Sequence, residues 1–418
     1  MRAVVVALGK IGLPIAVQLA RTGHDVVGCD VDPRVVATVN AGRSPFPGEA
    51  GLDELLAEVV PAGRLRATQD TAAAVADGAE LVIAVPPLLV DAAARPDWGI
   101  LDAVVDDIGR GLAGGTAPVV VSIETTVPVG TTRGRIAPAL AARSGRDTNG
   151  EVAVVFSPER VFSGRVFADL ATYPKLVGGL TPEGEARGVA AYEAFLDAEV
   201  RGMGSAEAAE LTKLVETTYR DVNIALANEF ARFADRTGID LDRVIAAANS
   251  QPFSHVHRPG VAVGGHCIPV YPRFYLAGDP GAQLPAAART VNEAMPSYAV
   301  DLLGDVAGAR VLILGVAYRG GVKETAFSGA FGVRDELQRR GAIPVATDPL
   351  YSGDELESLG FAPWRGEGVE KAVLQADHAE YARLGGGELP GVRVVVDGRG
   401  ILDPARFPGV EVRRIGRP

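Results

Sequence analysis

Cysteine is scarce in this chain, which has 2 cysteines among 418 residues. Two thiols cannot build a disulfide framework, so we expect a reducing, cytoplasmic environment. Basic residues are also in the minority, 41 against 52 acidic ones, and they form no blocks, which argues against nucleic acid as the main ligand. No apolar run reaches the roughly 18 residues of a membrane span, and no signal-peptide pattern opens the chain, so we expect a soluble protein.

Apolar residues are plentiful at 47%, and the order of strand and helix patterns predicts an α/β protein. We expect two Rossmann-like doubly wound parallel-sheet domains joined by a long central helical segment. The expected boundaries are 1–200 for the first α/β domain, 201–305 for the helical segment and 306–418 for a second, smaller α/β domain. No low-complexity linker separates them.

The first 32 residues have the pattern strand, tight turn, helix, strand. The turn "ALGKIG" fits the dinucleotide-binding fingerprint, except that Ala7 stands where its first glycine belongs. Gly9 would let the backbone approach a pyrophosphate, and Gly12 would let the helix pack closely on the sheet. Asp30 follows the second strand, where a carboxylate favours NAD over NADP. The alternative is an ordinary turn between a strand and a helix.

Further strand patterns precede possible ligand-binding segments. The runs "LVIAVPP", "APVVVSIETTVP" and "EVAVVFSP" alternate with Ala-rich helical segments, and their ends lead into "ETTVPVGTT" and "SPER". In doubly wound sheets, ligands bind outside the carboxyl ends of the strands. Residues 205–238 then show helical periodicity without proline, and residues 286–308 do so again. Residues 309–349 repeat the N-terminal strand, turn, helix and strand, with Asp348 at the end, and "GVRVVVDGRG" adds another strand.

The loop "GVAVGGHCIPVYP" carries Cys267 behind Gly264 and Gly265. A lone cysteine is more often a buried structural residue, and Cys29 within the strand "VVGCD" fits that interpretation. Cys267 differs because its glycines and prolines indicate a shaped, accessible loop. The spacing of a metal site is absent. Two hypotheses remain for Cys267: a thiolate nucleophile, or a thiol that only contacts a substrate.

At this point the sequence resembles the UDP-glucose/GDP-mannose dehydrogenase family, especially its branch that acts on UDP-N-acetyl-hexosamines (UDP-ManNAc or UDP-GlcNAc). The cysteine loop reads much like that branch's GxGVGGHCIPVDP, and the likeness extends over nearly the whole chain. The other matching segments, in order, are "ALGKIGLPIA", "NAGRSPF", "ETTVPVGTT", "SPERVFSG", "YPKLVGG", "ELTKLVETTYRDVNIALANEFA", "ARTVNEAMP" and "DGR" at 397–399.

The resemblance implies NAD-dependent, four-electron oxidation of a sugar C6 alcohol to a carboxylate, with Cys267 forming a thiohemiacetal and then a thioester. Lys213 would stabilise the oxyanion, Glu159 would be the general base of hydrolysis, and Thr126 would position the water. Each has an ordinary alternative: an exposed helix lysine, a salt-bridged glutamate and a strand-end threonine. The product would be a precursor of surface polysaccharide or of another glycosylated product.

The resemblance also implies binding residues and a homodimer. The expected cofactor-binding residues are Gly9, Lys10, Ile11, Gly12, Asp30, Arg34, Val85 and Thr126. The expected UDP-sugar-binding residues are Glu159, Arg160, Val161, Lys213, Thr217, Arg258, Gly264, Tyr318, Arg319 and Arg399, with Arg258 reaching a neighbouring subunit's site.

Several positions depart from the family pattern. Thr217 replaces an asparagine four residues after the lysine, and Tyr271 replaces an aspartate four residues after the cysteine. In the C-terminal turn "RGGVKETAFSGA", Lys323 replaces an aspartate, Ala326 an arginine and Gly329 a proline. The hydroxyls of Thr217 and Tyr271, or His266, are candidates to replace the missing groups. Two alternatives therefore stay open: a UDP-glucose 6-dehydrogenase, and a non-catalytic nucleotide-sugar-binding homologue.

Overall fold

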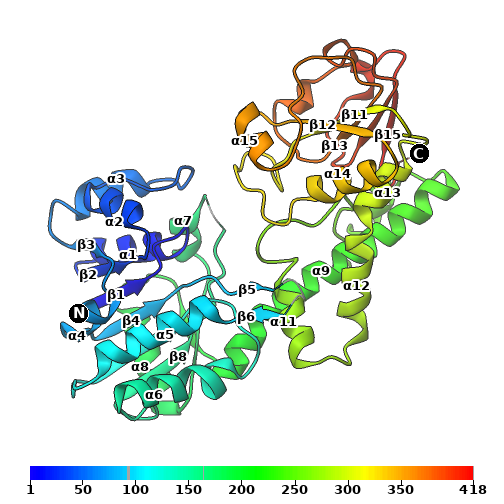
Figure 1. Ribbon diagram of the computed structural model, residues 1–418. Helices are drawn as coiled ribbons and strands as arrows, with labels where there is room; N and C mark the ends of the chain where they lie inside the picture. Colours follow the sequence, from blue (N-terminus) through cyan, green and yellow to red (C-terminus); the bar gives the residue numbers. More distant parts are fainter. Residues whose placement is uncertain (92–94, 163, 418) are drawn as a thin grey trace. The chain divides into compact units, whose positions relative to one another are not determined.

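The computed structural model describes residues 1–91, 95–162 and 164–417, and its chain divides into two units (Figure 1). The first comprises Met1–Glu216 with Arg273–Gly278, and the second comprises Thr217–Pro272 with Asp279–Pro418. Ser163, within the motif "SPERVFSG", lies outside the described residues. Within the described ranges, no helix has both the length and the apolar content needed to span a bilayer.

The first unit contains an eight-stranded sheet with the order β10-β9-β8-β7-β4-β1-β2-β3. Its strands are β1 (Arg2–Val6), β2 (Asp25–Cys29), β3 (Leu65–Thr68), β4 (Leu81–Ala84), β7 (Val119–Ile123), β8 (Val152–Phe156), β9 (Lys175–Gly179) and β10 (Val200–Gly202). A separate antiparallel pair is formed by β5 (Leu89–Val90) and β6 (Pro96–Asp97). The strand patterns recognised in the sequence correspond to β1, β2, β4, β7 and β8.

One junction in this sheet is antiparallel, between β8 and β9, where Phe156 pairs with Gly178. The other junctions of the sheet are parallel. Because β9 runs against its neighbour, its first residue, Lys175, lies at the edge where β7 and β8 end. The sequence did not predict this reversal, and it brings a lysine to the carboxyl edge of the sheet.

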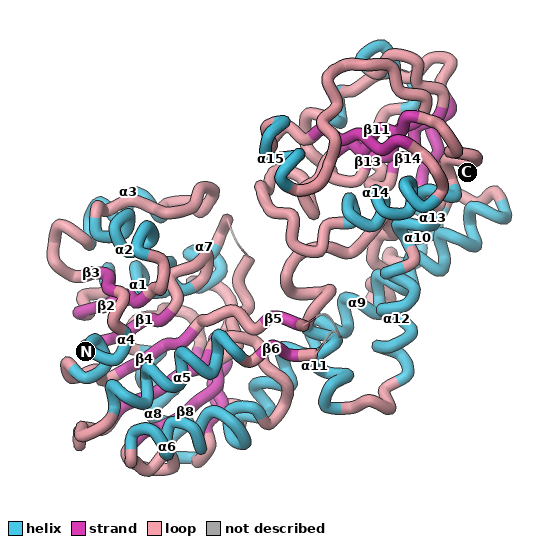
Figure 2. The backbone as a smooth tube through the Cα atoms, in the orientation of Figure 1, coloured by secondary structure: helices cyan, strands magenta, loops and turns pink. Residues whose placement is uncertain are grey.

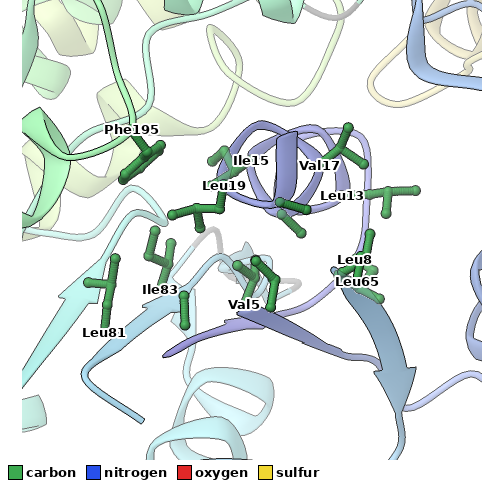
Figure 3. Packing of buried hydrophobic residues seen from close by; sticks show 14 of the residues in the cluster. Val5, Leu8, Leu13, Ile15, Val17, Leu19, Leu65, Leu81, Ile83 and Phe195 are labelled. Atoms are coloured by element: carbon green, nitrogen blue, oxygen red, sulfur yellow. The ribbon is translucent and has the colours of Figure 1, made fainter. Parts of the chain in front are cut away.

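The helices of the first unit are α1 (Gly12–Arg21), α2 (Pro33–Asn40), α3 (Leu52–Val59), α4 (Thr71–Ala76), α5 (Gly99–Leu112), a π-helical turn η1 (Thr132–Ile136), α6 (Ala137–Ser144), α7 (Val166–Leu170) and α8 (Pro182–Glu193). Helix α1 packs on β1 through a buried cluster that includes Val5, Leu13 and Leu19 (Figure 3). Phe195, beyond α8, belongs to the same cluster. Helix α4 contacts β1 and β2, and α4, α5 and α6 pack on one another in sequence order.

Helix α9 (Ala206–Thr237) begins in the first unit and continues into the second. It ends before Gly238, whose φ of 72° is the left-handed conformation that terminates helices. The remaining helices are α10 (Leu241–Ala248), α11 (Tyr271–Gly278), α12 (Gln283–Glu293), α13 (Met295–Asp301), α14 (Gly329–Arg339), α15 (Gly353–Ser358), and 3-10 turns at Tyr381–Arg383, Gly386–Glu388 and Pro404–Arg406. The helical patterns at 205–238 and 286–308 are thus found in α9, α12 and α13.

The second unit contains a parallel five-stranded sheet with the order β12-β11-β13-β14-β15. Its strands are β11 (Arg310–Leu314), β12 (Ile343–Thr347), β13 (Lys371–Leu374), β14 (Val394–Asp397) and β15 (Glu411–Arg414). Helix α14 packs against β11 and β12, and α13 packs against α14 (Figure 2). The predicted fold class, with two Rossmann-like sheets and a long central helix, is confirmed.

The two cysteines have opposite environments. Cys29, the last residue of β2, is fully buried, and burial raises the pKa of its thiol to about 11. Cys267 is exposed on the loop that precedes α11. The structural interpretation of Cys29 therefore holds, whereas Cys267 is accessible to a reactant.

A thiol-labelling experiment tests this contrast. The folded protein should take up one iodoacetamide, at Cys267, because alkylation needs an accessible thiolate. Cys29 should react only after denaturation. Peptide mass spectrometry of native and denatured samples checks this, with Cys267→Ser as the control that should remain unlabelled when folded. Fast labelling of Cys29 in the folded protein would contradict the assignment.

A second experiment concerns the turn between β1 and α1. A Cβ added to Gly12 would lie 2.0 Å from the carbonyl oxygen of Ala7, whereas a Cβ on Gly9 would meet no atom within 4 Å. Gly12→Ala should therefore lower the free energy of unfolding of the first unit by about 3 kcal/mol, because the backbone must move. Gly9→Ala, the matched control, should change it by less than about 1 kcal/mol. Urea titrations followed by circular dichroism check both, and equal losses would refute the close-approach role of Gly12.

Candidate active site

The turn after β1 is shaped to admit a phosphate group. Ala7 has a φ of 73°, the left-handed conformation that glycine usually supplies, so alanine fills the missing fingerprint position without changing the turn. Gly9 faces open space. Ile11 supplies no side-chain cap to α1. Leu13 already donates its N–H to the Gly9 carbonyl at 3.1 Å and Pro14 has no N–H, so this helix end offers an anion the N–H of Gly12.

Asp30 supports this turn from the end of β2. Its Oδ2 accepts a hydrogen bond from the N–H of Leu8 at 2.9 Å, and its Oδ1 accepts one from the N–H of Asp32 at 2.9 Å. Asp30 is only partly buried, so its carboxylate also remains within reach of a ligand hydroxyl. These features fit a bound NAD, whose pyrophosphate would lie at the N-terminus of α1 and whose ribose would lie at Asp30.

The other residues expected at the cofactor occupy the same edge of the sheet or the helices beside it. Val85 follows β4 and donates its N–H to Val6 of β1 at 3.0 Å. Lys10 is partly buried in the turn. Arg34 is exposed at the start of α2, where it pairs with Asp32 at 2.8 Å.

Glu159, the expected general base, is held by several donors beyond the end of β8. Its Oε1 accepts hydrogen bonds from the N–H groups of Arg160 at 2.6 Å and Val161 at 3.0 Å. Its Oε2 lies 2.8 Å from the ammonium nitrogen of Lys175. Burial opposes ionisation of this carboxyl, but the charge and hydrogen bonds of Lys175 outweigh burial and lower the pKa of Glu159.

Lys175 has a second carboxylate partner, Glu124, also at 2.8 Å. Glu124 follows β7 and accepts a hydrogen bond from the hydroxyl of Tyr192, which also lies 2.7 Å from the Ser122 hydroxyl. Burial raises the pKa of Glu124 to about 7, against the opposing effect of Lys175. Glu124, Lys175 and Tyr192 were not predicted as functional residues, although the first two lie within the segments "ETTVPVGTT" and "YPKLVGG". The sequence signal that could have identified them is a charged residue next to apolar strand residues, as at Lys175 and Glu124.

Lys213, the expected oxyanion-stabilising residue, contacts the same region. Its Nζ donates to the main-chain carbonyl oxygen of Glu159 at 2.5 Å. One turn earlier on α9, the buried carboxylate of Glu210 accepts hydrogen bonds from the N–H groups of Gly130 and Thr132 and from the Thr132 hydroxyl, at 2.6 to 2.8 Å. Glu210 thereby ties α9 to the loop "ETTVPVGTT", on which Thr126 is buried.

Arg160 points its guanidinium group at partners within the first unit. Its Nε donates to Glu216 of α9 at 2.7 Å, and its Nη1 donates to the Pro174 carbonyl at 3.2 Å. The first unit therefore brings together Glu159, Arg160, Val161 and Lys213, four of the residues expected to bind the UDP-sugar.

In the second unit, the cysteine loop is anchored to the C-terminal sheet domain. Val261 donates its N–H to the Gly398 carbonyl at 3.2 Å, and Gly265 donates to the Ala326 carbonyl at 2.8 Å. Gly264 lies so close to Tyr318 that an added Cβ would be 2.7 Å from the tyrosine Cβ. These contacts fix the loop that presents Cys267.

Arg399 binds this loop and its support. Its guanidinium group donates to the carbonyl oxygens of Gln375 at 2.6 Å, Tyr318 at 3.3 Å and Ala262 at 3.5 Å. Burial lowers the pKa of Arg399, although nearby aspartates partly offset this. Arg319 is exposed and donates to the Tyr318 hydroxyl at 2.9 Å. Gly264, Tyr318, Arg319 and Arg399 are thus neighbours around the cysteine loop.

Two expected substrate residues lie elsewhere in the second unit. Arg258 is exposed in a hollow of about 320 Å³ that Asp242, Asn249 and Arg417 also line. Thr217 is buried in α9. Among the described residues, no group of three or more His, Cys, Asp or Glu side chains could hold a metal ion.

Three of the departures from the family pattern have clear local surroundings. A Cβ on Gly329 would lie 2.4 Å from the Cβ of Ala262, so the glycine makes room for the alanine of the cysteine loop. Lys323 forms an ion pair with Glu355. Ala326 anchors the loop through its main-chain carbonyl, which needs no arginine side chain. Next to Cys267, His266 lies 3.6 Å from Glu324.

Comparison with known proteins agrees with this geometry. Residues 1–196 match the NAD binding domain of the UDP-glucose/GDP-mannose dehydrogenase family, and residues 207–294 match its central domain. A UDP-N-acetyl-D-mannosamine dehydrogenase of Pyrococcus horikoshii is 33% identical, with 100% of this chain and 99% of the relative covered. An NDP-N-acetyl-D-galactosaminuronic acid dehydrogenase of Ralstonia nicotianae is 32% identical, with 96% of each chain covered.

Solved structures give the same result. The structure of the UDP-D-ManNAc dehydrogenase from Pyrococcus horikoshii matches with a TM-score of 0.90 and 32% identity, covering 100% of this chain and 99% of that one. A UDP-glucose dehydrogenase from Pyrobaculum islandicum matches with a TM-score of 0.89 and 27% identity, covering 100% and 98%. The resemblance inferred from the motifs is therefore confirmed. The chain belongs to the UDP-glucose/GDP-mannose dehydrogenase family and is an NAD-dependent nucleotide-sugar dehydrogenase.

Proposed function

We propose that the protein oxidises the C6 alcohol of a UDP-N-acetyl-hexosamine to a carboxylate, with Cys267 as the covalent nucleophile. The observation that carries the mechanism is the exposed thiol of Cys267 on a loop that is fastened to the C-terminal sheet domain. The substrate class rests on the names of the relatives, several of which are dehydrogenases of N-acetylated nucleotide sugars.

The proposed reaction has two oxidations and a hydrolysis. NAD held by the turn after β1 and by Asp30 would supply the hydride acceptor for each oxidation. In the first, C6 loses a hydride and its hydroxyl loses a proton, which gives the aldehyde; the Cys267 thiolate then adds to C6, and the oxygen takes up a proton to give a thiohemiacetal. In the second, C6 loses a hydride and this hydroxyl loses its proton, which leaves a thioester. Water then forms a bond to C6 while its proton passes to Glu159, and the C6–S bond breaks with its electron pair returning to the cysteine sulfur.

Three further residues support these steps in the proposal. The ammonium group of Lys213 is held at the Glu159 main chain, where it stabilises the oxyanion that forms at C6. Thr126 positions the water. Arg319 and Arg399, beside the cysteine loop, are proposed to bind the diphosphate or the uridine, since guanidinium groups suit phosphate oxygens. Arg258 is proposed to serve a neighbouring subunit.

We also propose roles for the parts of the chain: residues 1–200 bind NAD, 201–305 form the central helical dimerisation segment, and 306–418 bind the UDP-sugar. A reactive, exposed Cys267 fits a reducing compartment, so we propose a cytoplasmic location.

The proposed homodimer would use α9. Tyr219, Leu226, Phe230 and Phe233 are all exposed, and their spacing places them on one face of the helix. An exposed apolar face of this kind usually marks an interface. Phe233 is 55% exposed, which makes it the most informative position to change.

The dimer can be tested by charge insertion. Phe233→Glu should shift the protein from dimer to monomer, because a carboxylate would have to be desolvated in the interface. Ala190→Glu, on the exposed side of α8, is the matched control and should remain dimeric. Analytical ultracentrifugation over a range of concentrations measures both. A dimer that tolerates Phe233→Glu would exclude this face of α9.

The catalytic proposal is tested with NAD and a panel of UDP-sugars. We expect two NADH and one uronic acid per UDP-N-acetyl-hexosamine, and the slower use of UDP-glucose. Faster turnover of UDP-glucose would favour a UDP-glucose 6-dehydrogenase. Binding of UDP-sugars without turnover of any of them would favour a non-catalytic homologue.

A pair of cysteine variants completes this test. Cys267→Ser should lower uronate formation at least about a thousandfold, because a hydroxyl is a far weaker nucleophile than a thiolate. Cys29→Ala should retain most activity, since Cys29 is buried in β2. An unchanged uronate yield from Cys267→Ser would remove the thioester mechanism.

A further inference from the structure

Three buried charged groups form a chain behind the proposed general base. The Lys175 ammonium lies 2.8 Å from a carboxylate oxygen of Glu124 and 2.8 Å from one of Glu159. The three side chains are 5%, 0% and 9% exposed, respectively. One positive charge therefore serves two carboxyl groups in a region with little water.

The charges do not balance if both carboxyl groups are ionised. Burial raises the pKa of Glu124 to about 7, while Lys175 lowers the pKa of Glu159. The other groups that face the pair are the Tyr192 hydroxyl on Glu124, the N–H groups of Arg160 and Val161 on Glu159, and the Lys213 ammonium on the Glu159 main chain. The Arg160 guanidinium is bound to Glu216. Glu159 is thus ionised first, and Glu124 loses its proton near neutral pH.

The position of Lys175 follows from the strand reversal. Phe156 of β8 pairs with Gly178 of β9, and continuing this antiparallel register sets Glu159 opposite Lys175. Ile123, the residue before Glu124, pairs with Phe156. A parallel β9 would begin at the opposite edge of the sheet, so the reversal is what delivers the ammonium to both glutamates.

We propose that Lys175 is a positioning residue that holds Glu159 ionised and in place to accept the proton of the hydrolytic water, and that Glu124 sets the pH dependence of this step. The inference rests on the proposed function, because it takes Glu159 as the base of thioester hydrolysis. The water proton passes to Glu159 and then to the departing Cys267 sulfur, so the step consumes one water and regenerates the thiol.

Glu124 acts through its charge. Below its pKa it is neutral, and the Lys175 ammonium is compensated by Glu159 alone. Above its pKa, Glu124 carries a second negative charge that interacts with the same Lys175 ammonium. This charge makes Glu159 a stronger proton acceptor. Hydrolysis should therefore accelerate as the pH rises through about 7 in the wild type, and this acceleration should be absent when position 124 cannot ionise.

The decisive variant is Lys175→Met, compared with Lys175→Arg, which keeps the charge. After mixing with NAD and a UDP-N-acetyl-hexosamine, Lys175→Met should form two NADH per site at a rate within about threefold of wild type. It should then hydrolyse the thioester at least about a hundredfold more slowly, because the base is displaced and poorly ionised. Intact-protein mass spectrometry should show the sugar nucleotide accumulating on Cys267. Lys175→Arg should recover part of the hydrolysis rate.

Glu124→Gln tests the pH role and does not depend on the folding of Lys175→Met. The ratio of wild-type to variant hydrolysis rates should increase about three- to tenfold between pH 6 and pH 8.5, with its midpoint near 7, in line with a stronger base in the wild type. Equal pH profiles would overturn the role of Glu124. Thioester hydrolysis at the wild-type rate in Lys175→Met would overturn the role of Lys175.

A substrate-free measurement separates this inference from the proposed function. The folded protein binds a proton at Glu124 that the unfolded chain has lost, so the stability that depends on this group decreases as the pH rises from about 4.5 to about 7. The urea midpoint of the wild type should fall relative to that of Glu124→Gln over this range. Parallel midpoints would refute the inference even if no UDP-sugar is turned over, whereas absence of turnover with the expected shift in midpoint would refute only the proposed function.

Discussion

The Lys175 ammonium is the charge on which the buried site of the first unit depends. A carboxylate without water or a counter-ion is expensive to bury, and this unit buries two of them, Glu124 and Glu159, at the ends of adjacent strands. Removing the ammonium would leave both uncompensated. The antiparallel β9 brings the ammonium to both carboxyl groups. The Tyr192 hydroxyl donates a hydrogen bond to Glu124, and the main-chain N–H groups after Glu159 donate to that residue. The direction of β9 therefore determines both the sheet topology and the pairing on which the proposed acid–base chemistry depends.

Much of this structure could be predicted from local sequence patterns. The buried strands, the glycine turn before α1 and the end of α9 at Gly238 each follow from residues close together in the chain. The direction of β9 could not be predicted, because an apolar run such as "KLVGG" indicates burial but not which way a strand runs. Lys175 went unrecognised for the same reason: its partners are distant in sequence, and a lysine at a strand end is usually exposed.

The cysteine loop illustrates a second limit of local patterns. Gly329 and Ala326 differ from the family pattern, and the sequence alone left open a weakened site. Contact with the loop explains Gly329, which leaves space for Ala262, whereas the Ala326 carbonyl accepts the N–H of Gly265 in a main-chain contact that any residue could make. A Cβ–Cβ separation of 2.4 Å cannot be accommodated, so alanine at 262 requires glycine at 329. Such paired changes are visible only when the chain is folded.

Each of the two Rossmann-like repeats carries an aspartate after its second strand, and the two aspartates have different surroundings. Asp30 after β2 accepts two main-chain N–H groups and remains partly exposed. Asp348 after β12 is buried and accepts hydrogen bonds from Val316, Ala317, Leu350 and His378. Because Gly321 donates to Nδ1 of His378, the proton of the imidazole is on Nε2 and points at Asp348. Asp348 is buried, and its Oδ2 already accepts three of these hydrogen bonds, so it is less accessible to a ribose hydroxyl than the partly exposed Asp30.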